Sequence, residues 1–319
     1  MKFQDKYLLD IQNSQLFASK TDLLIYERRE SMRERSEHVL SLFKPNYNGN
    51  YLVFSTNRTQ ENFSFQLLDN SLNVLLTGNE LALVPNLRLL FNSIDTSKYN
   101  VCVDITTLSH SLIFLITKIF IKEVTPKNLF MTYTEPKNYI KINNPCFDDE
   151  EYDLYDEILG MNYSVPGFSR IRKKDNEIII AAIGFERQRL LAIHEKFEPK
   201  NGLVPVIGFP SFKVGWNLTS LMMNYKVIED SHSEQSIISC DAASPFDFYN
   251  VLKEQYEIYS NDCTLLIAPF GTRPHCLGGA IFAANHPNTH LIYDFPVEKN
   301  YRSTAVNKCH LYVISRLLE

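Results

Sequence analysis

Three short segments recur in the same order in the two halves of the 319-residue chain. The matched pairs are Arg33-Glu34-Arg35 with Arg187-Gln188-Arg189 at an offset of 154 residues, Thr107 and His110 with Thr272 and His275 at 165, and Lys137-Asn138-Tyr139 with Lys299-Asn300-Tyr301 at 162. Any two α/β halves share an alternation of strands and helices. That alternation would explain matching apolar positions, but it would not explain the repeated polar residues. The pattern therefore predicts an internal duplication.

Each half alternates short apolar runs with helical segments. Strands are expected at 22–27, 51–56, 101–106 and 128–135, and again at 177–184, 204–210, 263–271 and 289–295; helices are expected at 30–43, 109–124, 185–197 and 274–286. Strands that alternate with helices pair in parallel through right-handed crossovers. We therefore predict an α/β fold of two tandem Rossmann-like units with mostly parallel sheets. The units are expected at residues 1–146 and 176–319, with an acidic linker and connector at 147–175.

Composition and charge narrow the classes of function. A net charge of −5 argues against a protein that coats nucleic acid, although it is compatible with a local basic pocket. The six cysteines include no CxxC pair, so buried reduced thiols are expected. The N-terminus does not read as a secretion signal, and the longest apolar stretch, residues 112–121, is too short to span a bilayer. These features predict a cytoplasmic protein with no membrane partner.

Several catalytic motifs are absent from the sequence, namely GxxxxGK[ST], a GxGxxG after a strand, HExxH and GxSxG. Their absence argues against a Walker-type NTPase, a dinucleotide redox enzyme, a zinc protease and an α/β-hydrolase. We therefore expect no cofactor and no metal site.

Two turns combine hydroxyl groups, backbone N–H groups and the start of a helix, at residues 104–110 and 269–275. Both follow predicted strands, where ligands bind in open parallel sheets, and this combination suits a phosphate or another anion. The candidate ligand-binding residues of the two turns are Asp104, Thr106, Thr107, Ser109, Gly271, Thr272 and Arg273. Gly271 would permit close backbone approach, and Arg273 would add a bidentate contact. The alternative is helix capping alone.

Arginines and histidines lie beside these turns. Arg33, Arg187 and Arg189 follow strands near helix starts, where positive charge opposes the helix dipole, so an anionic ligand would relieve the cost. The alternative for these arginines is exposure to solvent or pairing with nearby glutamates. His110 and His275 are the candidate catalytic acid–base residues. The alternative for both histidines is packing beneath the turn.

The segments VDITTLSHSL and IAPFGTRPHCL, which begin at Val103 and Ile267, resemble the strand–turn–helix of CRISPR-associated Rossmann-fold (CARF) sensors and the related SAVED domains. Gly271-Thr272-Arg273 matches the Gly-Thr-Lys part of their turn, with arginine in place of lysine. The first half lacks the glycines and the basic residue. The resemblance implies two paired Rossmann-like units that bind an oligonucleotide second messenger between them in antiviral defence. No further effector is recognisable in the sequence, so any signal would pass through a partner protein.

Three hypotheses follow. The first is a nucleotide-sensing module that acts through a protein partner in a complex rather than as an enzyme. The second is a phosphodiesterase-type nuclease that uses His110 or His275, and the third is a non-catalytic scaffold subunit of a larger complex. If a ligand binds, the second half should contribute more of the affinity, because Gly271 and Arg273 stand where the first half has Thr106 and Leu108.

Overall fold

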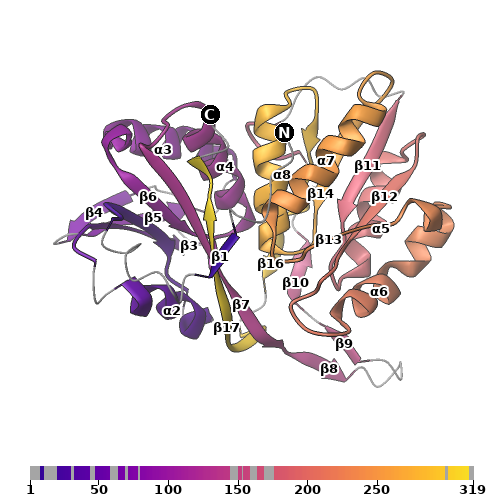
Figure 1. The fold of residues 1–319 in the computed structure, drawn as a ribbon, viewed down its shortest axis with the longest axis horizontal. Helices are drawn as coiled ribbons and strands as arrows, with labels where there is room; N and C mark the ends of the chain where they lie inside the picture. Colours follow the sequence, from indigo (N-terminus) through magenta and orange to yellow (C-terminus); the bar gives the residue numbers. More distant parts are fainter. Residues whose placement is uncertain are drawn as a thin grey trace. The chain divides into compact units, whose positions relative to one another are not determined.

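The computed structural model describes residues 8–10, 20–29, 32–43, 47–57, 64–68, 71–77, 80–143, 150–152, 154–158, 164–168, 176–298 and 301–315. It confirms the predicted α/β class, because two mostly parallel sheets are interleaved with helices (Figure 1). Contacts between residues divide the chain into two compact units. We call Asp5–Asn138 with Ser303–Glu319 the large-sheet unit, and Met1–Gln4 with Tyr139–Arg302 the small-sheet unit.

The large sheet has the strand order β1-β17-β7-β6-β2-β3-β5-β4. Its strands are β1 (Leu8–Asp10), β2 (Leu23–Glu27), β3 (Asn50–Asn57), β4 (Ser64–Leu68), β5 (Ser71–Thr77), β6 (Asn100–Asp104), β7 (Asn128–Tyr139) and β17 (Ser303–Val313). The five strands from β7 to β5 in this order pair in parallel, whereas β1 and β4 pair antiparallel with their neighbours. The unit also contains α2 (Arg33–Phe43), α3 (Glu80–Ser93), the short 3-10 helix η4 (Thr96–Lys98) and α4 (His110–Lys122).

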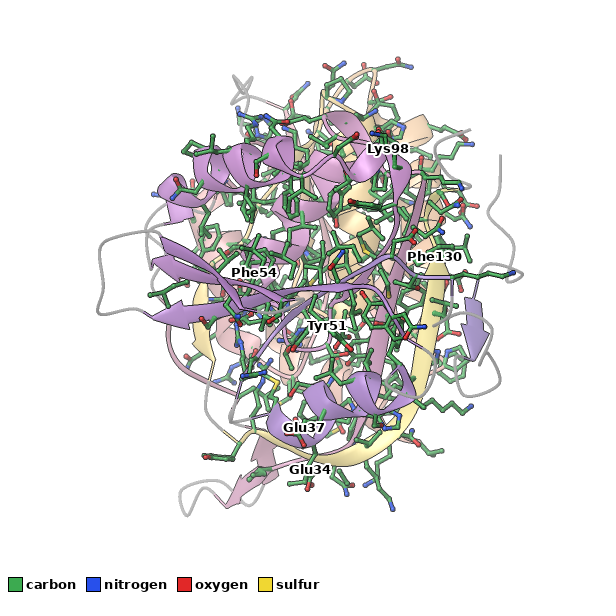
Figure 2. The ribbon with its side chains drawn as sticks, turned by 90° about the vertical axis from the view of Figure 1, so that its left-hand side faces the viewer. Glu34, Glu37, Tyr51, Phe54, Lys98 and Phe130 are labelled. Carbon is green, nitrogen blue, oxygen red and sulfur yellow. The ribbon has the colours of Figure 1, made fainter. Side chains whose placement is uncertain are left out.

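Helix α2 covers one face of the large sheet, and α3 and α4 cover the other (Figures 1 and 2). Val39 and Phe43 of α2 pack with Leu24 of the sheet in a buried cluster. Glu34 and Glu37 lie on the opposite, exposed side of the same helix (Figure 2). Because helices cover both faces of the sheet, every residue of β2 is buried, and buried and exposed residues do not alternate along this strand.

The small sheet has the order β13-β12-β11-β14-β15, and every neighbouring pair is parallel. Its strands are β11 (Glu177–Ala182), β12 (Leu203–Gly208), β13 (Ile238–Cys240), β14 (Thr264–Pro269) and β15 (His290–Leu291). Its helices are α5 (Arg187–Phe197), α6 (Trp216–Asp230), the 3-10 helix η5 (Glu234–Ser236), α7 (Pro245–Tyr259) and α8 (Arg273–Asn285). Helices α7 and α8 approach closely at Gly278, where a Cβ atom would collide with the Pro245 carbonyl oxygen.

The parallel strands of both sheets follow one another in the same spatial order. Numbered by their position along the chain, the five strands of each sheet read 3-2-1-4-5, which is the order found in Rossmann folds. The segments between the second and third strands differ, since the large sheet has β4 there and the small sheet has α6. The shared order agrees with a duplication without demonstrating one, so the duplication stays a prediction.

The C-terminal segment lies in a different unit from the one expected. Residues 176–319 were predicted to form the second unit, but β17 is hydrogen-bonded into the large sheet between β1 and β7. Leu8 pairs with Tyr312 in this arrangement, and Cys309 and Leu311 are buried in the core of the large-sheet unit. Burial of these side chains explains why the last strand returns to the first sheet.

The acidic stretch contains strands where the sequence indicated a solvated linker or the start of a helix. Within it, β9 (Glu150–Tyr152) pairs with β8 (Lys141–Asn143), and β10 (Tyr155–Ile158) pairs with β16 (Pro296–Glu298).

In the described parts of the chain, none of the helices combines the length and the apolar character needed to cross a bilayer.

Candidate ligand-binding site

The crevice of a sheet with the order 3-2-1-4-5 opens between its first and fourth strands, at their carboxyl ends. In the small sheet these strands are β11 and β14, and their last residues, Ala182 and Pro269, are register partners. Each strand is followed within two residues by a glycine, Gly184 after β11 and Gly271 after β14. The predicted turn at 269–275 therefore lies at the point of the sheet where ligands bind in this fold.

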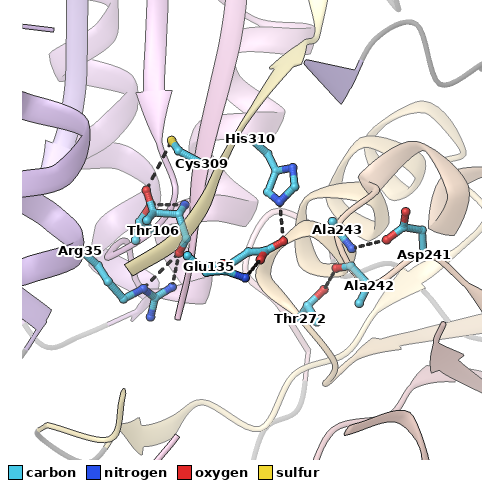
Figure 3. A network of polar contacts seen from close by, with 11 residues as sticks. Arg35, Thr106, Glu135, Asp241, Ala242, Ala243, Thr272, Cys309 and His310 are labelled. Atoms are coloured by element: carbon cyan, nitrogen blue, oxygen red, sulfur yellow. Dashed lines mark hydrogen bonds and ion pairs between the residues drawn. The ribbon is translucent and has the colours of Figure 1, made fainter. Parts of the chain in front are cut away.

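The start of α8 presents a concentrated set of backbone donors. Thr272 caps the helix, because its Oγ1 accepts a hydrogen bond from the His275 backbone N–H at 3.3 Å. The same hydroxyl donates to the Ala242 carbonyl oxygen at 2.6 Å (Figure 3). Among the described residues, the backbone N–H groups of Gly271 and Thr272 have no hydrogen-bond acceptor. Two such donors at the positive end of a helix dipole can bind an anion.

Glycine is required on both sides of this crevice. A Cβ atom on Gly271 would lie 2.8 Å from Nδ1 of His275 and 3.4 Å from the Ile183 carbonyl oxygen. A Cβ atom on Gly184 would lie 2.7 Å from the Phe270 carbonyl oxygen. The two turns therefore meet backbone to backbone, and the absence of side chains leaves the main-chain donors accessible.

His275 lies beneath the turn and is buried. Its Nε2 is 3.0 Å from the Asp241 carbonyl oxygen and 3.4 Å from Sγ of Cys240, while its buried Nδ1 has no hydrogen-bond partner. Burial lowers the pKa of His275 to about 4, so the imidazole is neutral at pH 7. With its proton on Nε2 toward Asp241, the ring presents Nδ1, a lone-pair acceptor, to Gly271. This environment is poorly suited to the predicted acid–base role near neutral pH.

The three arginines predicted for the second half lie in different surroundings. Arg189 is buried and donates two hydrogen bonds to the Asp294 carboxylate, from Nε at 2.8 Å and from Nη2 at 2.6 Å. Its guanidinium also lies over the rings of Phe270 and Tyr293, at 4.4 and 5.0 Å. Arg187 is exposed at the start of α5, and Arg273 is buried at the start of α8. Arg189 therefore holds the end of the sheet together, rather than standing free for a ligand.

Glu186 is a polar residue of this region that the sequence suggested only as a pairing partner for the arginines, not as part of the site. It stands at the N-cap position of α5, its Oε2 is 3.5 Å from Nη1 of Arg189, and its buried Oε1 has no hydrogen-bond partner. Burial raises the pKa of Glu186 to about 7, against the opposing effect of the Arg189 charge. A carboxyl group that titrates near neutral pH can act as either a donor or an acceptor.

Helix α6 supports the crevice from behind, and the sequence had no signal for this role. The Ser220 hydroxyl is 3.1 Å from the Ile183 carbonyl oxygen and 3.0 Å from that of Gly184, and Nδ2 of Asn224 donates to the Gly184 carbonyl at 2.8 Å. Both side chains are buried. They hold the turn after β11 in place. Among the described residues, the corresponding part of the first half contains β4 rather than a helix, so the repeat could not point to them.

The equivalent turn of the large sheet is closed by the protein itself. The buried carboxylate of Glu27, the last residue of β2, accepts the Ser109 backbone N–H at 3.0 Å and is paired with Arg29. Thr107 is wholly buried, and its Oγ1 donates to the Glu27 carbonyl oxygen at 2.5 Å. Ser109 caps α4 by accepting the Leu112 N–H. A protein carboxylate thus occupies the place where an anionic ligand was predicted.

Asp104 adds a second buried carboxyl group at this edge. Its Oδ1 accepts hydrogen bonds from the Thr106 N–H, the Thr106 hydroxyl and the Thr132 hydroxyl, at 3.1, 2.5 and 3.3 Å, whereas its Oδ2 has no partner. Burial raises the pKa of Asp104 to about 6. His110 is the first residue of α4 and is also buried, and the side chain of Arg33 lies outside the described residues. Two acidic groups at this edge disfavour an anionic ligand there.

In both units, the last arginine of the repeated Arg-x-Arg segment lies over a tyrosine, which is within the fifth strand in the large sheet and two residues after the fifth strand in the small sheet. Arg35 lies over Tyr133 at 5.6 Å, and it donates from Nε and Nη2 to the Thr134 carbonyl oxygen at 3.0 and 2.6 Å (Figure 3). Arg189 lies over Tyr293 and pairs with Asp294. The repeated arginines therefore share a structural role in the two units.

The site must be interpreted from its own geometry. Comparison of the chain with protein-family models and with curated protein sequences found no match to either.

Proposed function

We propose that this protein is a nucleotide-sensing module that binds an anionic nucleotide, such as an oligonucleotide second messenger, at the crevice of the small sheet. The observation that supports the proposal most directly is the pair of N–H groups at Gly271 and Thr272, at the start of α8, for which the described residues supply no acceptor. Two glycines keep the backbone around these donors free of side chains. A phosphate group has the charge and the acceptor geometry that such donors bind best.

The resemblance of the Gly271-Thr272-Arg273 turn to CARF and SAVED domains favours a nucleotide over other anions. It also suggests a role in antiviral defence, in which ligand binding is passed to a partner protein. The surroundings of His275 favour binding over hydrolysis, because a buried, neutral imidazole is a weak proton donor at pH 7. Hydrolysis of the ligand by the purified protein, detected by chromatography of the products, would instead favour the phosphodiesterase alternative.

Isothermal titration calorimetry against a panel of cyclic and linear oligoribonucleotides and mononucleotides tests the proposal. We expect at least one ligand to bind, and we expect Gly271→Ala to weaken its binding, because the new methyl group would collide with Nδ1 of His275 and displace the turn that carries the donors. Gly279→Ala, inside α8, is the matched control, since its Cβ atom would make only ordinary contacts of 3.5–3.6 Å. Absence of heat and of a melting shift across the whole panel would refute the proposal.

A further inference from the structure

Three aromatic rings form a cluster within the small-sheet unit, which we call the aromatic cluster: Tyr139, Phe185 and Trp216. The ring centroids of Tyr139 and Trp216 are 5.1 Å apart, those of Phe185 and Trp216 are 5.7 Å apart, and those of Tyr139 and Phe185 are 5.9 Å apart. Trp216 is buried, whereas Tyr139 and Phe185 are only partly buried. The cluster therefore combines one buried aromatic residue with two that are partly exposed.

The aromatic cluster is attached directly to the crevice. Phe185 follows Gly184, and a Cβ atom on Gly184 would lie 3.9 Å from Cα of Gly271. Trp216 is the first residue of α6, the helix whose Ser220 contacts the Gly184 carbonyl oxygen. Phe185 and Trp216 are thus held beside the turn that lies next to Gly271.

A positive charge lies at the same cluster. Nζ of Lys213 is 6.0 Å from the centroid of the Trp216 ring, and the lysine side chain is exposed. An aromatic surface with a neighbouring cation is a combination that proteins use to bind single-stranded nucleic acid, in which the rings stack on bases and the cation attracts phosphate.

We propose that the aromatic cluster is a base-stacking subsite, so that the ligand of the small-sheet crevice must contain a nucleobase and cannot be a simple phosphate or sugar phosphate. This inference rests on the proposed function. The phosphate binds the N–H groups of Gly271 and Thr272, and an adjacent base stacks on the exposed part of Phe185 and Tyr139. Stacking on a ring face tolerates any base, so the subsite favours nucleotides as a class over their base-free analogues.

The test compares oligoribonucleotides of A, C, G or U with an abasic ribose-phosphate oligomer of the same length. We expect the best base-containing oligomer to bind about five- to a hundredfold more tightly than the abasic one, the range given by loss of one stacked base. Trp216 is the only tryptophan in the chain, so its fluorescence reports on the cluster directly. Base-containing ligands should change this emission, and the abasic oligomer should change it less.

Phe185→Leu removes the ring but keeps an apolar side chain, and it should abolish the difference between the two kinds of oligomer. Phe185→Tyr should retain that difference. Tyr225→Leu is the matched control, because it removes an exposed ring from α6 outside the cluster. Equal affinity of the wild-type protein for both kinds of oligomer would overturn the subsite and leave the anion site standing. Binding of neither would overturn both proposals.

Discussion

The backbone N–H of Ser109 donates a hydrogen bond to the buried carboxylate of Glu27 at 3.0 Å. This contact places a negative charge of the protein at the N-terminus of α4, where the sequence predicted an external anion. In the small sheet, β11 ends in apolar residues, and the donors at the start of α8 remain open. In the large-sheet unit, a side chain thus accepts a hydrogen bond from the backbone at the start of the helix. In the small-sheet unit, we propose that a ligand does so.

Replacing this carboxylate should destabilise the protein. Glu27→Gln keeps the shape of the side chain, but it removes the charge and turns an amide NH₂ toward either Ser109 or Arg29. We expect a loss of about 1–3 kcal/mol in the free energy of unfolding, measured by urea denaturation. Glu37→Gln, at an exposed position on α2, should change that free energy by no more than about 0.5 kcal/mol. Equal effects of the two variants would argue against a structural role for Glu27.

The helix caps of the two turns should differ in their effect on ligand binding. Thr272→Ala and Ser109→Ala each remove a side-chain acceptor from a helix start, so each should cost about 1 kcal/mol of stability. Only Thr272→Ala should also weaken nucleotide binding, because the proposed ligand binds at the turn that Thr272 belongs to, whereas the turn of Ser109 lies against the Glu27 carboxylate. Calorimetric titration of both variants tests this asymmetry. A similar loss of affinity in both would mean that the ligand is held by the two turns alike.

The buried Arg189–Asp294 pair should be far more important for stability than an exposed pair of similar geometry. Asp294→Asn removes the carboxylate that accepts both close hydrogen bonds from the buried guanidinium and leaves only Glu186, at 3.5 Å, as a counter-charge, so we expect a loss of up to about 3–5 kcal/mol. The control is Glu123→Gln, which breaks the exposed pair with Arg88 and should cost at most about 1 kcal/mol. Thermal or urea unfolding measures both. An effect of Asp294→Asn no larger than that of Glu123→Gln would contradict this role of Asp294 and would mean that Glu186 or solvent compensates the Arg189 charge.

Much of the fold could be predicted from the sequence because its determinants are local. Apolar runs such as those of β2 and β11 are typical of strands covered on both faces, and Pro274 with Thr272 marks the start of α8. The turn at 269–275 was likewise recognisable, since its glycine, hydroxyl and helix start are adjacent in the chain.

Features that depend on distant contacts could not be predicted in the same way. Glu27 ends an apolar run, but its partner Ser109 lies 82 residues further on, so no local pattern distinguishes it from a solvated glutamate. The Asp294 partner of Arg189 is 105 residues away, and this pairing makes a predicted ligand residue part of the core. Strand β17 follows the last recognisable repeat and pairs with β1 near the start of the chain. Which sheet this strand joins depends on where its side chains become buried in the folded protein, and no local pattern indicates it.

Asp104 should make the stability of the protein fall as the pH rises. Its pKa is raised by burial from 3.8 to about 6, so between these values the folded state binds more protons than the unfolded state. Stability from this group is therefore complete below about pH 4 and is lost as the pH rises through about 6. The total is on the order of 3 kcal/mol for a shift of this size.

Asp104→Asn removes the titration while keeping the shape of the side chain. Urea unfolding at closely spaced pH values between 4 and 8 should show that the variant gains stability relative to the wild type as the pH rises, with the gain levelling off above about pH 7. The difference between the two proteins is the quantity to follow, because His275 acts in the opposite sense. Burial lowers its pKa to about 4, so its contribution is lost as the pH falls from 6.5, but it is common to both proteins and cancels in the difference. A difference that stays constant across this range would mean that Asp104 is charged in the folded protein at all these pH values, and that its Oδ2 has a partner in solution.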